Sequence, residues 1–179
     1  MKSKQINKSQ GFTIIETLIV LAIAATIFLV VFLAVSALNR SSRNTQRKDD
    51  AAAVIAAFSD YASNNNGALP GKLAFVAPNL DLCAAIDSSC TATTNTDIVA
   101  TAKLGYYSGT GTTAGTAGDV NLISAGSGAT APATTTDSLN IYVGATCNGN
   151  ALTAGSTRSL AALYGTELSS GFSWQCEAS

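Results

Sequence analysis

Gly11-Phe12-Thr13-Ile14-Ile15-Glu16 opens an apolar run that continues to Leu38. From Phe12 to Leu38 the chain has 27 residues and a single charged side chain, Glu16. A helix of that length can cross a hydrocarbon layer of about 30 Å. Because a carboxylate at membrane depth is unfavourable, Glu16 is expected to have a function and a partner.

Three interpretations of this apolar segment compete. A secretory signal peptide would be cut near Ala34 or Ala37, but the apolar run is longer than the usual signal core of about 7 to 15 residues. An ordinary membrane anchor explains the length and leaves Glu16 without a partner. The third interpretation also accounts for the basic residues and the glycine that precede the run.

The third interpretation depends on a resemblance to a known family. The residues that carry the resemblance are Lys2, Lys4, Lys8, Gly11, Phe12, Glu16 and the run to Leu38. In that order they closely resemble the class III leader and N-terminus of type IV prepilins and the related pseudopilins. The resemblance covers the leader and the N-terminal helix. One departure is that Leu33 stands where many type IVa pilins have a proline, so the resemblance does not imply the locally unwound segment of some pili.

The resemblance implies how the N-terminus is processed. A prepilin peptidase that is also an N-methyltransferase would cut between Gly11 and Phe12 and methylate Phe12. Glu16 would then meet the N-terminal amine of a neighbouring subunit during assembly. A physical reason supports this pairing, because a buried cation and a buried anion are each more costly alone than together.

The sequence predicts four successive parts. Residues 1–11 are a leader peptide, residues 12–38 a helix that spans the membrane or lies in a filament core, residues 39–63 an amphipathic extension of that helix, and residues 64–179 a globular head. In the extension the apolar positions recur at steps of three and four, as on one face of a helix: Ala51, Val54, Ile55, Phe58, Tyr61 and Ala62. Asp49, Asp50 and Asp60 are placed on the opposite face, and the run 63–67 followed by Pro70 is a stop signal.

The head is expected to be an antiparallel β-sheet. Alternation predicts strands over 139–143, 160–164 and 172–176, each with one buried and one wetter face, and a turn over 167–171. The Thr-, Ala-, Gly- and Ser-rich segment 91–137 is interpreted as surface loops that join short or edge strands. The fold class is therefore α+β, a long N-terminal helix packed on a C-terminal antiparallel sheet, as the resemblance also implies.

Four basic residues follow the apolar run: Arg40, Arg43, Arg47 and Lys48. Two interpretations of these residues are equally supported: a contact to lipid headgroups at the membrane surface, and a solvated helix face. A contact to the acidic head of another subunit is a third use.

The four cysteines are Cys83, Cys90, Cys147 and Cys176. Disulfides in an extracytoplasmic setting are preferred over a four-cysteine zinc site. Four cysteines allow three pairings. We predict Cys83 with Cys90, which close a small local loop, and Cys147 with Cys176, which tie the last strand back to the sheet.

No catalytic group of residues is visible, and no cofactor or metal is expected. The chain has no histidine, so a Ser-His or Cys-His nucleophile is excluded. The net charge is −1 and becomes more negative once the leader lysines are removed, which argues against nucleic-acid binding by the head.

These features favour a structural role. The expected protein is a type IV pilin, in the membrane before assembly and then in an extracellular filament made of copies of itself, built by a pilus assembly platform. Such a filament would serve adhesion, motility or DNA uptake. The alternatives are a pseudopilin of a type II secretion system and a minor tip pilin that acts as a binding module. Several major pseudopilins bind calcium in a C-terminal loop, for which Glu167 and Glu177 give weak support.

Overall fold

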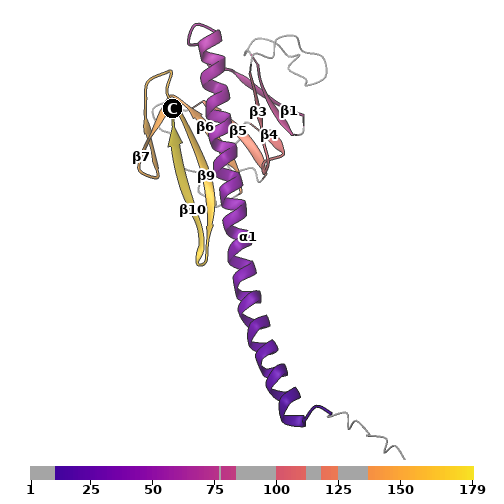
Figure 1. Ribbon diagram of the computed structural model, residues 1–179. Helices are drawn as coiled ribbons and strands as arrows, with labels where there is room; N and C mark the ends of the chain where they lie inside the picture. The colour runs from indigo at the N-terminus through magenta and orange to yellow at the C-terminus, as the bar shows by residue number, and fades with distance from the viewer. Residues whose placement is uncertain (1–10, 77, 84–99, 112–117, 125–136) are drawn as a thin grey trace, which may run out of the picture. The chain divides into compact units, whose positions relative to one another are not determined.

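The computed structural model describes residues 11–76, 78–83, 100–111, 118–124 and 137–179 (Figure 1). The chain divides into two compact units, Met1–Asn39 and Arg40–Ser179. Helix α1 (Ile14–Asn64) contributes its first half to one unit and its second half to the other. The fold is α+β, as the sequence predicts.

Helix α1 ends close to the predicted stop. Asn66 and Gly67 both have positive φ, 52° and 80°, and the Gly67 N–H donates to the Ala62 carbonyl at 2.7 Å. Such left-handed residues satisfy the last free carbonyls of a helix, and glycine adopts this conformation at little cost. The sequence 64–67 therefore ends the helix by itself.

The second half of α1 buries the predicted apolar face. Ala51, Val54, Phe58 and Tyr61 are each at most 3% exposed. They pack into one core with residues of the sheet, including Val120, Leu139, Ile141, Leu160, Ala162 and Tyr164. This core holds α1 on one face of the sheet within the second unit.

The main sheet has five strands in the order β10-β9-β6-β5-β4. Their bounds are β4 Gly109–Gly111, β5 Asp119–Ser124, β6 Leu139–Val143, β9 Leu160–Leu168 and β10 Gly171–Ala178. The three strands predicted from the sequence are β6, β9 and β10, and they pair antiparallel as expected. The pairs β4–β5 and β5–β6 are parallel, so the sheet is mixed and not wholly antiparallel.

Five further strands lie outside the main sheet. Four of them lie in segments for which no strand was predicted, and the fifth, Ala100–Lys103, lies in segment 91–137, where short or edge strands were expected. A three-stranded antiparallel sheet in the order β1-β2-β3 is formed by β1 (Lys72–Val76), β2 (Asn79–Cys83) and β3 (Ala100–Lys103). The hairpin of β7 (Ala145–Asn148) and β8 (Ala151–Ala154) follows β6.

This hairpin covers the second face of the main sheet. A second core contains Tyr142, Ala145, Ala161 and Leu163, with Trp174 packed against it. The expectation of a wetter face on β6 and β9 is therefore wrong. The residues expected on the wetter face include Tyr142. They are buried under the β7–β8 hairpin, on the face of the sheet away from α1.

Among the described residues, the interpretation of 91–137 as surface loops that join short or edge strands is confirmed for β3 and β4, which are short and lie at sheet edges, and is wrong for β5. Strand β5 lies inside the main sheet, and its Val120 is fully buried. Leu104 and Tyr107, 4% and 2% exposed, belong to the main core. Short apolar islands between small polar residues were enough to build an interior strand, because its neighbours supply the rest of the core.

Candidate functional site

The N-terminal motif forms the first turn of α1. The Thr13 hydroxyl accepts a hydrogen bond from the Glu16 N–H at 3.4 Å, and the Thr13 carbonyl accepts from the N–H groups of Glu16 and Thr17 at 3.1 and 3.3 Å. A threonine followed three residues later by a glutamate is the sequence of a capping box, so the helix starts here for a local reason. Glu16 is exposed and lies at the positive end of the helix dipole.

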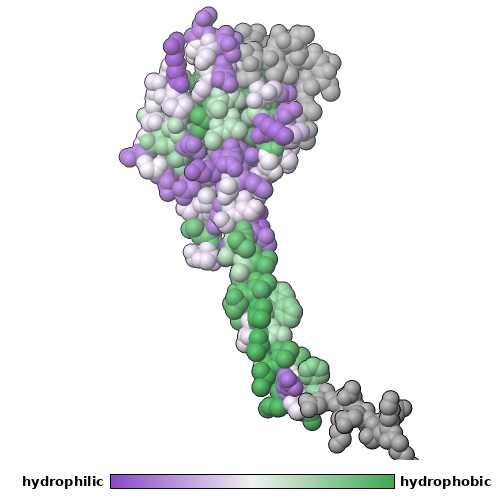
Figure 2. Space-filling view, viewed as in Figure 1, coloured by the Kyte–Doolittle hydropathy of each residue, from purple (hydrophilic) through white to green (hydrophobic). Residues whose placement is uncertain are grey.

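The unit that begins with this motif has an apolar surface (Figure 2). Every large apolar side chain from Phe12 to Leu38 is between 47% and 84% exposed. By length and composition this part of α1 could cross a membrane. An apolar surface of this extent is not stable against water, so it requires lipid or other protein chains to cover it.

The basic residues after the apolar run do not share one environment. The Arg47 side chain is 1% exposed, whereas Lys48 is exposed and Arg40 half-buried. Arg43 is 43% exposed and pairs with Glu167. A buried Arg47 is neither a headgroup contact nor part of a solvated face, so the membrane-proximal interpretation is wrong for this residue. Acidic side chains of the same chain surround it instead.

These acidic side chains belong to a charged contact between α1 and the segments around the sheet, made by Arg43, Asn44, Arg47, Asp50, Tyr106, Asp137 and Glu167. Arg47 Nη2 donates to Glu167 Oε1 at 2.7 Å and to Asp137 Oδ2 at 2.9 Å. Arg43 Nε donates to Glu167 Oε1 at 3.0 Å, and its Nη2 bonds the second carboxylate oxygen. Glu167 therefore receives a two-pronged bond from one arginine and a further bond from the other.

Asn44 ties the backbone of β9 to the same helix turns. Its Nδ2 donates to the Glu167 carbonyl at 2.9 Å, and its Oδ1 accepts from the Glu167 N–H at 2.8 Å. Arg47 Nη1 donates to the same Oδ1 at 3.0 Å. Both the backbone and the side chain of Glu167 are thus fixed by α1.

Asp50 makes the second half of the charged contact. It is 4% exposed, so its placement on the solvent face of the helix is wrong. Oδ1 accepts from the Gly105 N–H at 2.7 Å, and Oδ2 accepts from the N–H groups of Tyr106 and Tyr107 at 2.8 and 3.0 Å. Three successive backbone donors around one carboxylate compensate for its burial.

Aromatic rings enclose the Arg47 guanidinium. Its Cζ lies 4.5 Å from the centre of the Tyr106 ring and 5.4 Å from that of Phe172. The Tyr106 hydroxyl accepts from Arg47 Nη2 at 2.7 Å and donates to Asp137 Oδ2. Cation–π attraction is strongest where water is excluded, as it is around this side chain.

The charges of the contact are mutually stabilising. Hydrogen bonding from Arg43, with a further bond from Arg47, lowers the pKa of Glu167 to about 2. Burial by itself would lower the pKa of Arg47, but its bonds to Asp137, Glu167 and Tyr106 outweigh that effect and raise it. Arg47 and Glu167 are therefore ionised near neutral pH.

Sequence reasoning missed Asn44, Asp50, Tyr106 and Asp137 as members of the charged contact. A signal was present for the helix side, because Arg47 lies four residues before Ala51 and Asp50 four before Val54. Residues four apart share a helix face, so the charged residues continue the buried stripe. For the two residues outside the helix no comparable signal exists in the sequence.

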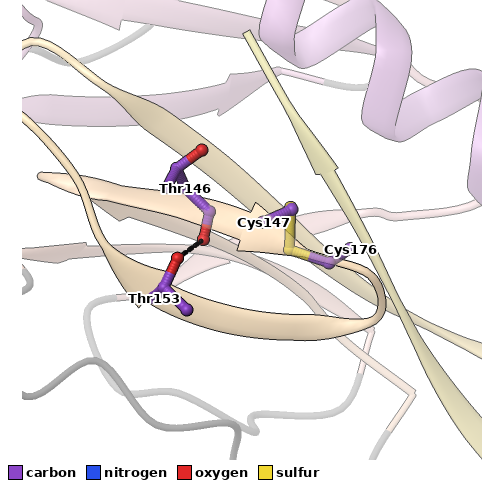
Figure 3. Close-up of a disulfide and its surroundings, with 4 residues drawn as sticks. All are labelled: Thr146, Cys147, Thr153 and Cys176. Carbon is purple, nitrogen blue, oxygen red and sulfur yellow. Dashed lines mark hydrogen bonds between the residues drawn. A yellow bond between two sulfur atoms is a disulfide. The ribbon is translucent and has the colours of Figure 1, made fainter.

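The predicted Cys147–Cys176 disulfide is present (Figure 3). The Cα atoms are 5.7 Å apart, and the bond links β7 to the last strand, β10. Thr153 Oγ1 donates to the Thr146 carbonyl at 3.3 Å in the same hairpin. The other predicted pair includes Cys90, which lies outside the described residues, so the pairing of Cys83 with Cys90 stays a prediction.

Within the described ranges, no group of three or more metal-binding side chains comes together. Glu167, one of the two glutamates considered for calcium, has both carboxylate oxygens bonded to arginines. Glu177 is not in the charged contact, and one of its oxygens is buried with no hydrogen-bond partner.

Comparison with known proteins identifies the N-terminus. The family model described as the prokaryotic N-terminal methylation motif matches residues 6–35. The chain matches no curated protein and no solved structure. Residues 6–35 therefore carry the class III leader motif that type IV pilins and pseudopilins share, and this N-terminal segment is pilin-like or pseudopilin-like.

Proposed function

We propose that this protein is the structural subunit of a type IV pilus, cut between Gly11 and Phe12, N-methylated at Phe12 and assembled through residues 12–38. The observation that carries the proposal is the exposed apolar surface of these residues, most of which lie within the matched methylation motif. The motif implies processing by a prepilin peptidase and assembly in a pilus-like system, and the apolar helix is consistent with a membrane anchor before assembly. In a filament, copies of the helix would cover one another's apolar surface.

Glu16 is the assembly residue in this proposal. Its N–H is bonded to Thr13, while its carboxylate has no hydrogen bond or ion pair among the described residues. The carboxylate is therefore available for the methylated amine of Phe12 in a neighbouring copy. Two charges that neutralise each other in an apolar surrounding would set the axial position of each new subunit.

The test compares variants that separate assembly from helix capping. Glu16→Ala and Glu16→Gln should insert into the membrane at least as well as the wild type, because a charge is removed from lipid. Surface filaments should be lost in both. Thr13→Ala is the matched control, since it removes the capping hydroxyl and keeps the carboxylate, and it should retain filaments. Normal filament yield in both Glu16 variants would contradict the role of the carboxylate.

A pseudopilin of a type II secretion system is the second candidate, and the N-terminal motif is common to both. The arginine-bound state of Glu167 disfavours a calcium site there, which was the feature that supported a pseudopilin. Deletion of the gene separates the two candidates. Loss of surface filaments with normal export of secreted enzymes supports the pilus, and the reverse result supports the secretion system.

The filament's task is proposed as adhesion, twitching motility or DNA uptake, with an extracytoplasmic head. The Cys147–Cys176 disulfide supports this location, because disulfides persist in oxidising compartments. The few basic residues of the head disfavour direct DNA binding by it. Assays of surface attachment, spreading and transformation in the deletion strain distinguish the three tasks.

A further inference from the structure

The charged contact lies in a polar stretch of α1 that separates two apolar ones. Residues 40–50 read RSSRNTQRKDD and contain no apolar side chain, whereas the run to Leu38 is apolar on all sides and residues 51–62 have an apolar face. Within 40–50, all of which the structure describes, the buried side chains are Arg47 and Asp50. The sheet thus meets α1 through charges at one end and through apolar side chains at the other.

A charged contact of this kind is a poor source of stability. Replacement of a buried ion pair by apolar side chains of similar size is often neutral or stabilising, since the charges must first leave water. An amphipathic helix that only had to bind the sheet would do so with apolar residues throughout. The charges therefore call for another explanation.

The explanation is that the charges select the part of α1 on which the sheet packs. The sheet has an apolar face, and the chain offers that face two apolar partners: residues 51–62, where it packs, and the far more apolar residues 12–38. Contacts of the hydrophobic kind are non-directional and do not distinguish such partners. The face of α1 at 51–62 is also rich in small residues, and the shape of such a face fixes the position of the sheet along the helix only weakly.

The charges distinguish the two partners. Glu167 and Asp137 accept from Arg47, and the backbone N–H groups of 105–107 donate to Asp50. If the sheet were displaced along α1 toward residues 12–38, these acceptors and donors would face apolar side chains and stay buried without partners. The cost of unpaired buried charges therefore disfavours every position of the sheet along α1 except the observed one.

We propose that Arg47 and Asp50 are positioning residues, which confine the head to the second half of α1 and keep residues 12–38 free for lipid and for other subunits. This inference rests on the proposed function for the use of the free segment. The position of the sheet on the helix is a property of the single chain.

The test measures that position in the unassembled full chain in detergent micelles. Spin labels are attached at two exposed positions, Thr45 of α1 and Ser170 of the β9–β10 turn, through introduced side chains other than cysteine. The variant under test combines Arg47→Met and Asp50→Leu with Asp137→Leu and Glu167→Leu, so that both positioning residues and both acidic partners are replaced. We expect one narrow distance in the wild type and added, shifted distances in the variant, where a one-turn displacement is about 5.4 Å along the axis.

The controls address charge and folding. Lys48→Gln with Asp49→Asn and Asp60→Asn changes three exposed charges of the same helix and should leave the narrow distance unchanged. If the apolar variant lacks the near-ultraviolet circular dichroism of a packed head, Asp50→Asn with Asp137→Asn and Glu167→Gln replaces it and should also add distances. A wild-type distance distribution in the folded variant overturns the proposal. Because no filament is needed, this outcome is independent of whether the protein forms a pilus.

Discussion

The Phe172 ring lies directly over Gly165. A Cβ atom on Gly165 would stand 1.6 Å from Cε1 and 2.3 Å from Cζ of that ring. Gly165 pairs with Trp174 on the neighbouring strand, so the ring crosses a position that any other residue would fill. This close approach places Phe172 beside the Arg47 guanidinium and connects the β9–β10 hairpin with the charged contact.

Substitution Gly165→Ala should therefore destabilise the head. The ring has to move, which costs about 1 to 3 kcal/mol of unfolding free energy as in other overpacked sites. Urea unfolding monitored by tryptophan fluorescence measures the change. Gly105→Ala is the control, because its Cβ would meet only Asp50 Oδ1 at an ordinary 3.7 Å, and an equal loss there would show that the Phe172 contact is not the cause.

Asp50→Asn tests the backbone contacts at residues 105–107. An amide oxygen replaces a carboxylate that accepts three N–H bonds, and at least one donor is left without an acceptor. We expect a loss of about 2 to 4 kcal/mol in unfolding free energy and faster hydrogen exchange at these amides. Asp49→Asn, one residue away and exposed, should change stability by less than about 0.5 kcal/mol. Equal effects of the two substitutions would contradict the assignment.

The sequence predicted the parts of the fold that local pattern controls. The helix predicted from Phe12 begins at Ile14, its end at Asn64 follows from the stop signal at 63–67, and β6, β9 and β10 follow from alternation. The alternation misled at the second face, where Tyr142 and Leu163 are buried by a hairpin that no local pattern indicates. In the segment of small residues 91–137 short strands were expected, but an interior strand was not, because its burial depends on distant neighbours.

The site was predictable to a similar extent. The motif at Gly11, Phe12 and Glu16 depends on fixed spacing within one segment, which the sequence displays completely. The charged contact depends on Tyr106, Asp137 and Glu167 meeting one helix face, and long-range contacts of this kind are set by the topology of the sheet. Sequence alone thus identified the arginines and assigned Arg47 to the wrong environment.

Acid should weaken the head through Glu167. Its pKa falls from 4.5 in a free chain to about 2 in the folded protein. A carboxyl group with a lowered folded-state pKa contributes stability above pH 4.5 and loses that contribution as the pH falls toward 2. Urea midpoints at pH 7 and pH 3 measure the effect. The wild type should lose more stability between these values than Glu167→Gln, and identical losses would show that Glu167 is not ionised in the contact.

Removal of the disulfide tests the attachment of the last strand. The linked residues are 29 positions apart, so the chain-entropy account expects Cys147→Ala with Cys176→Ala to cost about 3 to 4 kcal/mol of unfolding free energy. Thr153→Ala in the same hairpin is the control and should cost less than about 1.5 kcal/mol, the value of one hydrogen bond. Thermal unfolding under non-reducing conditions compares the two, and a double variant as stable as the wild type would show that the β7–β8 hairpin holds β10 without the bond.

The intact mass of subunits from sheared surface filaments tests the central claim most directly. The account predicts a chain that begins at Phe12, lacks residues 1–11 and carries one added methyl group at its N-terminus. The same mass should be absent from a strain without the prepilin peptidase, where the full leader is retained in the membrane. Assembled subunits that keep residues 1–11, or that begin after Ala34 or Ala37, would contradict the account.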